Sequence, residues 1–155
     1  MPTTVLDGLD DLKAAAGRHL GHSEWHEVTQ EQIDGFAEVT GDHQWIHVDV
    51  ERAKAGPFGG PIAHGYLTLS LLPMLTAEIV EIRGVPMIVN AGLDTLRFRA
   101  PVPVGAKVRA GLELKSARDA PGGFVHVVMR ATIEVEGSRK PALTAETVTL
   151  FSAGP

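Results

Sequence analysis

The sequence contains no cysteine, which excludes several kinds of structure and chemistry. Disulfide bonds, thiolate zinc sites and a cysteine nucleophile are all impossible in this chain. A chain without disulfides suits the reducing cytosol, so we expect a cytoplasmic protein. Its 155 residues show no repeat, linker or low-complexity tract, and this length predicts one domain, residues 1–155.

Secretory signals, long hydrophobic runs and an excess of basic residues are absent as well. Residues 1–20 lack a basic segment followed by an apolar one, so we expect no secretory signal. The most apolar run, residues 62–75, is interrupted by His64, Gly65 and Pro73, and it is shorter than the ~18 residues of a membrane span. The 14 basic and 19 acidic residues give a net charge of −5, which argues against a nucleic-acid partner.

Several catalytic motifs are also missing. Ser70 has no Gly-x-Ser-x-Gly context, which favours a small helix residue over a nucleophile. No phosphate-binding or dinucleotide-binding glycine pattern is present, because Gly56, Gly59 and Gly60 follow no predicted strand. These glycines indicate loop flexibility.

One apolar helix and a set of strands dominate what remains. Leu67, Leu71 and Leu75 repeat at a spacing of four, which predicts a buried helix over residues 65–80 that Pro73 kinks or ends. After Val85 the chain is rich in Val, Ile, Thr and Leu, and turn residues divide it into short stretches. Strands in sequence with short turns predict an antiparallel meander and an α+β domain. The expected strands are residues 86–93, 96–99, 107–115, 124–135 and 142–151.

The segment before the apolar helix contains two shorter helices and a long loop. Residues 9–20 have an amphipathic pattern that predicts a helix. Thr29 with Gln32 matches a capping box, and Gly41 is expected to end the helix that this box begins. Residues 42–60 are then mostly irregular, with a single turn capped by Asp49, and a loop of this length is usually functional.

Asp42 and His47 are the first candidates for chemistry in this loop. A carboxylate and an imidazole can bind one water and share proton transfer. From spacing alone, a turn-capping Asp42 and a surface His47 is the commoner arrangement. His43, His47 and His64 also raise a metal site, but a zincin helix would carry Glu where Gln44 stands, so we expect no metal.

Gly65 is a candidate of a different kind. At the first turn of the apolar helix, its backbone N–H would lie at the positive end of the helix dipole, where it can stabilise an oxyanion. The alternative is that a glycine here only allows the helix to pack closely against the sheet. The pattern around Gly65 does not separate these two roles.

Three segments in order resemble the MaoC-like dehydratase family, which includes the (R)-specific enoyl-CoA hydratases, over about residues 25–151. The commoner family pattern has Asn-Pro where this chain has Gln44-Trp45, while the Gly-Asp pair and the histidine five residues after Asp42 are kept. The segments are Phe36-Ala37-Glu38-Val39-Thr40-Gly41-Asp42-His43-Gln44-Trp45-Ile46-His47, Pro61-Ile62-Ala63-His64-Gly65 and Leu96-Arg97-Phe98-Arg99-Ala100-Pro101-Val102-Pro103-Val104-Gly105.

The resemblance implies a hot-dog fold, in which an antiparallel sheet wraps around one long central helix, usually as a homodimer. It implies that Asp42 and His47 activate water, that the Gly65 N–H forms the oxyanion hole, and that no cofactor is needed beyond the coenzyme A of the substrate. Trp45, Ile46, Phe58 and His64 are expected to bind substrate. Arg97 and Arg99 are candidates for phosphate contacts, although a solvated strand face explains them as well.

The expected function is therefore a hydro-lyase of fatty acid metabolism. It would hydrate trans-2-enoyl-CoA, or the corresponding acyl-carrier-protein thioester, to the (R)-3-hydroxyacyl product, or run in reverse. One alternative is an acyl-CoA thioesterase on the same fold, which directs water at the carbonyl carbon. The other is a non-catalytic subunit that only binds acyl thioesters.

Overall fold

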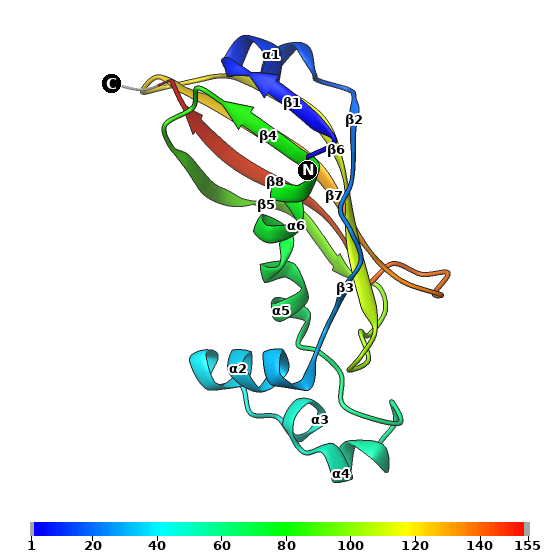
Figure 1. Cartoon of the computed structure of the whole chain (residues 1–155). Helices are drawn as coiled ribbons and strands as arrows, with labels where there is room; N and C mark the ends of the chain where they lie inside the picture. The colour runs from blue at the N-terminus through cyan, green and yellow to red at the C-terminus, as the bar shows by residue number, and fades with distance from the viewer. Residues whose placement is uncertain (1, 154–155) are drawn as a thin grey trace.

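A strongly curved antiparallel sheet and the helix in its concave face form the upper part of the molecule (Figure 1). The structure is a computed structural model that describes residues 2–153, so the ends of the predicted domain, residue 1 and residues 154–155, lie outside the described residues. The strands of the sheet run in the order β2-β6-β7-β8-β5, and β3 also pairs with β6. They are β2 (His19–His22), β3 (His26–Glu27), β5 (Ile88–Phe98), β6 (Lys107–Ala120), β7 (Phe124–Val135) and β8 (Leu143–Ser152).

The helix in the concave face has two segments, α5 (Gly65–Ser70) and α6 (Leu72–Ile79). They meet at Leu71, whose backbone is still right-handed helical. Pro73 has no N–H to donate to the carbonyl of Leu69, and the break falls after the six residues of α5. The predicted start at Gly65 and the predicted effect of Pro73 are both confirmed.

The core lies between this helix and the concave face of the sheet. Leu75 and Ile79 of α6 are fully buried, and α6 packs mainly against β6, β2 and β4 (Val80–Arg83). Side chains alternate along a strand, so every second residue of each strand points to the helix. The best-buried sheet residues of this core are Val108, Leu114, Val127, Ile133 and Leu143.

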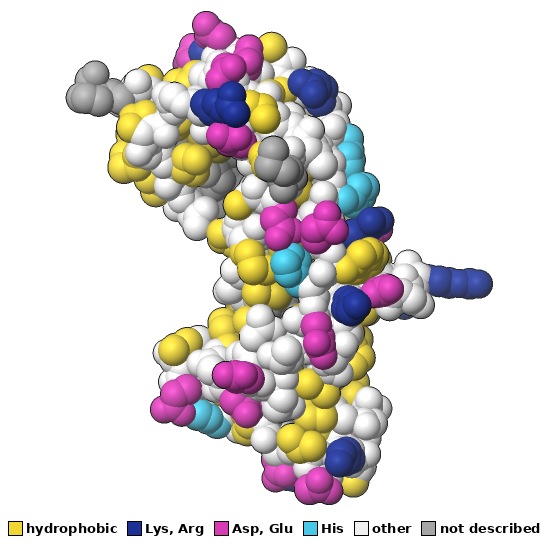
Figure 2. All heavy atoms as spheres, in the orientation of Figure 1, with side chains coloured by type: hydrophobic (Ala, Val, Ile, Leu, Met, Phe, Trp, Pro, Cys, Tyr) yellow, Lys and Arg dark blue, Asp and Glu magenta, His cyan; other side chains and the backbone are white. Residues whose placement is uncertain are grey.

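The remaining elements flank this core. A two-stranded parallel pair, β1 (Thr4–Asp7) with β4 (Val80–Arg83), and α1 (Gly8–Ala14) lie at the top of Figure 1. Below the sheet, three helices form a separate lobe, joined to it by a narrow waist in Figure 2. These helices are α2 (Gln30–Thr40), α3 (Trp45–Val48) and α4 (Val50–Lys54).

Several predicted boundaries are wrong. The helix expected over residues 9–20 ends at Ala14, because Gly17 turns the chain with a φ of 88° and Leu20 then lies in β2. Val80 belongs to β4 and not to the central helix. The strands expected at residues 86–93 and 96–99 are one strand, β5, which continues through two register shifts. Among the described residues, no helix is long and apolar enough to cross a membrane.

Candidate active site

The loop that carries Asp42 is fixed by the ends of α2. The predicted capping box is confirmed, since Gln32 N donates to Thr29 Oγ1 at 3.2 Å and Thr29 N donates to Gln32 Oε1 at 3.0 Å. At the other end Gly41 has a φ of 81°, a left-handed conformation that glycine adopts without strain. The chain therefore leaves the helix sharply and presents the exposed carboxylate of Asp42 directly after it.

His47 is buried in α3 with only 6% of its surface exposed. Its Nδ1 lies 2.7 Å from the carbonyl oxygen of Ile62. A carbonyl oxygen can only accept, so Nδ1 carries the proton, and the neutral ring keeps a lone pair on Nε2. Gln30 Nε2 of α2 also donates to the His47 carbonyl at 2.9 Å, which holds α3 against α2.

His64 is enclosed between His47 and α2, with 2% of its surface exposed. Its ring stacks on the His47 ring at 3.8 Å between centroids and 23° between planes, and Phe36 lies 4.9 Å away. His64 Nε2 donates to the backbone carbonyl of Asp42 at 3.0 Å. Within the described residues its Nδ1 is buried without a partner. One imidazole thus contacts both members of the predicted Asp42 and His47 pair.

Burial lowers the pKa of His47 below its usual range because the charged ring loses water. The hydrogen bond to Ile62 opposes this shift, the neighbouring His64 adds to it, and the carboxylate of Asp42 opposes it. His47 is therefore unprotonated at neutral pH and can accept a proton through Nε2.

One side-chain oxygen or nitrogen from each of Asp42, His47 and His64 lies within 4.8 Å of the others. This separation fits one bridging water, because two hydrogen bonds of about 2.8 Å from a single water span about 4.5 Å. A metal ion fits less well. The two rings are stacked and do not converge on a point, and Nδ1 of His47 and Nε2 of His64 already bond to carbonyls.

Gly65 and His47 line the same cavity of about 390 Å³ beside the start of α5. Gly65 is the first residue of this helix, so its N–H has no acceptor within the helix. No hydrogen bond from this N–H occurs among residues 2–153. The amide is thus free to donate into the cavity.

The alternative role of Gly65, close packing, is also observed. A Cβ built on Gly65 would lie 2.9 Å from Cε1 of Phe98, at the end of β5. Phe98 in turn meets Tyr66 edge-on at 6.0 Å between ring centroids. Glycine therefore keeps the helix start both open to the cavity and close to the sheet.

Some of the other predicted site residues line the smaller cavity and others do not. Phe58 lines the cavity beside His47, and so does Arg99. Trp45 and Ile46 do not line this cavity: the Trp45 ring lies under the Arg52 guanidinium at 4.3 Å, and the Ile46 carbonyl accepts from Ile62 N at 3.0 Å. His43, which was considered as a metal ligand, is exposed. Its Nε2 lies 3.9 Å from Oε2 of Glu38.

Three cavity residues, Tyr66, Thr68 and Phe98, were not predicted from the sequence. Thr68 lies three residues after Gly65, so a helix wheel would have placed it on the same side of α5, whereas Tyr66 lies about 100° away and has no such signal. Phe98 comes from a strand more than thirty residues later, and only the pairing of β5 with β8 places it over α5.

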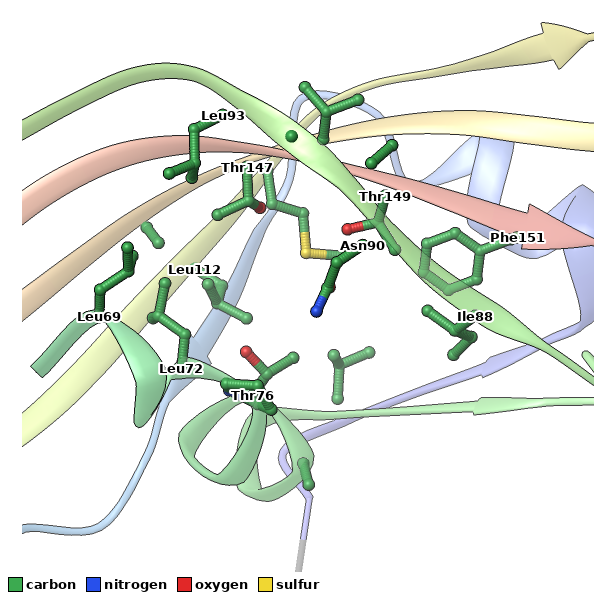
Figure 3. A pocket seen from close by; sticks show the side chains of 18 of the residues that line it. Leu69, Leu72, Thr76, Ile88, Asn90, Leu93, Leu112, Thr147, Thr149 and Phe151 are labelled. Atoms are coloured by element: carbon green, nitrogen blue, oxygen red, sulfur yellow. The ribbon is translucent and has the colours of Figure 1, made fainter. Parts of the chain in front are cut away.

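A second, larger cavity of about 910 Å³ continues along the same helix (Figure 3). Leu69 and Thr76 line it from the helix side, and Ile88, Asn90 and Leu93 line it from β5. Thr147, Thr149 and Phe151 line it from β8, opposite the helix. Because α5 lines both cavities in turn, they follow one another along the seam between the helix and β5.

The family model described as "MaoC like domain" matches residues 11–137. The chain belongs to this family. A relative from Mycobacterium tuberculosis (strain ATCC 25618 / H37Rv), 3-hydroxyacyl-thioester dehydratase Z, is 50% identical over 149 residues, covering 96% of this chain and 99% of the relative. Nodulation protein N of Rhizobium leguminosarum bv. viciae is 42% identical over 149 residues, covering 95% and 92%.

The structure agrees with this membership. The (R)-hydratase from A. caviae involved in PHA biosynthesis superposes with a TM-score of 0.70 at 25% identity, covering 86% of this chain and 94% of that one. The expected α+β hot-dog architecture is thereby confirmed. In this MaoC-like chain, all three segments that carried the resemblance surround the smaller cavity.

Proposed function

We propose that this MaoC-like protein is a hydro-lyase that interconverts trans-2-enoyl thioesters and (R)-3-hydroxyacyl thioesters. The proposal depends on one observation: the Asp42 carboxylate lies within 4.8 Å of a ring nitrogen of His47, and His47 lines the same cavity as Gly65, although Asp42 itself is not among the residues that line it. The names of its dehydratase and hydratase relatives support the same reaction.

His47 is proposed as the base and Asp42 as the second group that holds the water. Water would donate one hydrogen to Nε2 of His47 and the other to the Asp42 carboxylate, while its oxygen attacks C3. The protonated His47 then returns that proton to C2, so one water is consumed and both residues regain their starting states. A positioned acid–base group contributes about 10²–10⁴ in rate.

The Gly65 N–H is proposed to receive the thioester oxygen. Attack at C3 pushes electrons toward that oxygen, and a donor fixed at a helix start stabilises the charge without reorganising. Phe98 and Tyr66 would flank the acyl group there. This chemistry requires no cofactor beyond the coenzyme A, or carrier-protein pantetheine, of the substrate.

His64 is proposed as a positioning residue. At 2% exposure it is enclosed, so the expected direct contact with substrate is less suited to it than a role through its neighbours. Its N–H fixes the Asp42 backbone, and its ring sets the orientation of His47 by stacking. Catalytic groups must be held within a fraction of an ångström, and such second contacts provide that restraint.

A homodimer through β5 is also part of the proposal. Among the described residues β5 pairs only with β8, on one side, and ten of its eleven residues are exposed. An unpaired edge of this length is a site for pairing with another chain. Figure 2 shows hydrophobic side chains gathered on the left of the upper lobe, along which Figure 1 draws β5. Of the exposed hydrophobic residues of this edge, Met87 and Val89 lie outside both cavities, while Ile88, Leu93 and Phe98 also line one of them.

Light scattering of two matched variants tests the dimer. Lysine on an edge strand opposes strand pairing, so Val89→Lys should shift the mass toward one chain. Val39→Lys, on α2 and 82% exposed, should leave the mass unchanged. A Val89→Lys protein with an unchanged dimer mass would exclude this edge as the interface.

A cytoplasmic location, suggested by the absence of cysteine, is also part of the proposal.

Crotonyl-CoA separates the proposed hydratase from the two alternatives. A hydratase removes the conjugated enoyl absorbance and releases no free thiol, and chiral analysis should find the (R)-3-hydroxy product. A thioesterase releases free thiol, and a binding subunit gives neither signal. Thiol release without loss of the enoyl chromophore would overturn the proposal.

A further inference from the structure

The larger cavity contains four polar side chains that solvent reaches, since Asn90 is exposed and Thr76, Thr147 and Thr149 are partly exposed. The side chains of Asn90, Thr147 and Thr149 lie on its β5 and β8 walls, and Thr76 faces them from α6 (Figure 3). Among the described residues, none of these four side chains has a hydrogen-bond partner. Asn90 and Thr149 are directly paired across the two strands, which brings an amide next to a hydroxyl.

These groups differ from the rest of the cavity wall. The other side chains around them are mostly apolar, as at Leu69, Leu72, Ile88 and Phe151. Polar groups facing an apolar ligand without a partner cost about 1–3 kcal/mol each, so a plain hydrocarbon chain would leave these four poorly matched. A chain with an oxygen atom at their level would satisfy them.

The position of the polar groups relative to Gly65 sets which part of a substrate reaches them. At a rise of about 1.5 Å per residue, Leu69 lies about 6 Å and Thr76 about 16 Å along the helix from Gly65. A thioester carbonyl at Gly65 would therefore place the reacting carbons in the smaller cavity. Only carbons well beyond C3 would enter the larger one.

We propose that the polar wall formed by Asn90, Thr76, Thr147 and Thr149 selects acyl chains that carry a hydroxyl or keto oxygen beyond the reacting carbons. This inference rests on the proposed function and adds a substrate class to it. Asn90 offers both a donor and an acceptor, and the three hydroxyls rotate to match either a hydroxyl or a ketone.

Matched substrates test the proposal. Trans-2-enoyl-CoA esters of equal chain length are compared with and without one hydroxyl, which is moved along the chain in a series. At the best position the wild-type kcat/KM should favour the hydroxylated ester by roughly three- to tenfold, the value of one neutral hydrogen bond. Asn90→Leu and Thr149→Val should remove that preference and leave hydration of crotonyl-CoA unchanged.

Two controls keep the outcome decisive. Thr132→Val changes a threonine on the outer face of β7, beside Arg130, and should retain the preference. Saturated acyl-CoA pairs, with and without the hydroxyl, give dissociation constants that do not depend on turnover. Equal kcat/KM and equal binding along the series would overturn the inference, while failure to hydrate crotonyl-CoA would instead contradict the proposed reaction.

Discussion

The two cavities along the central helix hold their polar groups in opposite ways. In the smaller cavity His47 is buried, its Nδ1 is bonded to Ile62, and its ring is stacked on His64. In the larger one, Asn90 and the threonines have no partner among the described residues. A group held by several contacts can position a proton, whereas a free group can adapt to a ligand. The comparison separates residues for chemistry from residues for selectivity.

Asp42→Asn and His47→Asn should produce the largest effects. The asparagine at position 47 can still donate to the Ile62 carbonyl from the place of Nδ1, so it removes only the basic Nε2. We expect each variant to lower kcat for crotonyl-CoA by about 10²–10⁴. The preference among acyl tails and the melting temperature should change little.

Near-full activity in both variants would show that the smaller cavity is not the reaction site. A variant that instead lost only the tail preference would mean that the two cavities do not have the separate roles given to them here.

Gly65→Ala should have the next largest effect. The added Cβ would lie 2.9 Å from the Phe98 ring, so the ring must move within the smaller cavity. A displacement of this kind near the reacting carbons costs up to about a hundredfold in rate. Replacing Phe98 by alanine in the same chain should restore part of the loss.

Gly35→Ala is the matched control in α2, where a Cβ meets nothing within 4 Å. It should keep full activity and raise the free energy of unfolding by about 0.5–1 kcal/mol, since alanine favours helix over glycine. If Gly65→Ala were as active as Gly35→Ala, the contact with Phe98 would have no role in catalysis.

Substitutions of His64 should lower kcat by a smaller factor, and two variants can separate the contribution of its hydrogen bond from that of its ring. His64→Gln can keep the donor to the Asp42 carbonyl without the ring, and His64→Phe can keep the ring without the donor. We expect each to lower kcat by about tenfold while KM changes little, because each removes one of two restraints.

A rise in KM with unchanged kcat would instead support the direct substrate contact predicted from the sequence. Equal loss of kcat and folding stability in both variants would leave His64 a purely structural residue and contradict the positioning role.

Acidic pH should lower kcat/KM by less than any of the substitutions above. Burial lowers the pKa of His47, so kcat/KM should fall only at a pH below about 6.5, the usual value for histidine. The same shift affects stability. The unfolded chain binds the proton more tightly than the folded one, and so stability decreases as the pH falls through this range.

His47→Asn removes this titration and should flatten the dependence of the melting temperature on pH below about 6.5. A wild-type activity profile with its acid limb above that pH would mean that the pKa of His47 is raised and not lowered.

Local signals were sufficient for both ends of α2 and for the start of the central helix. The capping box of Thr29 with Gln32 and the left-handed Gly41 depend on neighbours in sequence, and the leucines after Gly65 repeat at the helix period; all three were predicted correctly. The parallel pair of β1 and β4 was missed, because each strand is short and they pair across more than seventy residues. The single strand β5 was divided in two because its register shifts near Ala91 and Asp94 interrupt the alternation.

In the candidate site, too, contacts between distant segments could not be predicted from the sequence. The spacing of Asp42 and His47 indicated a pair, but the orientation of His47 depends on the Ile62 carbonyl and on stacking by His64, both from a later segment. Trp45 is as apolar as Phe58, yet it packs on Gly56 while Phe58 lines the cavity. Residue type does not distinguish these outcomes, because tertiary contacts decide them.

A double variant tests the central claim most directly, namely that Asp42 and His47 act on one water. If they share it, kcat for crotonyl-CoA in the double variant Asp42→Asn/His47→Asn should be about the same as in the less active of the two single variants. The effects of groups that act as a unit are not additive. If the two losses multiply, Asp42 and His47 act in separate steps, and the shared-water arrangement proposed for this site is wrong.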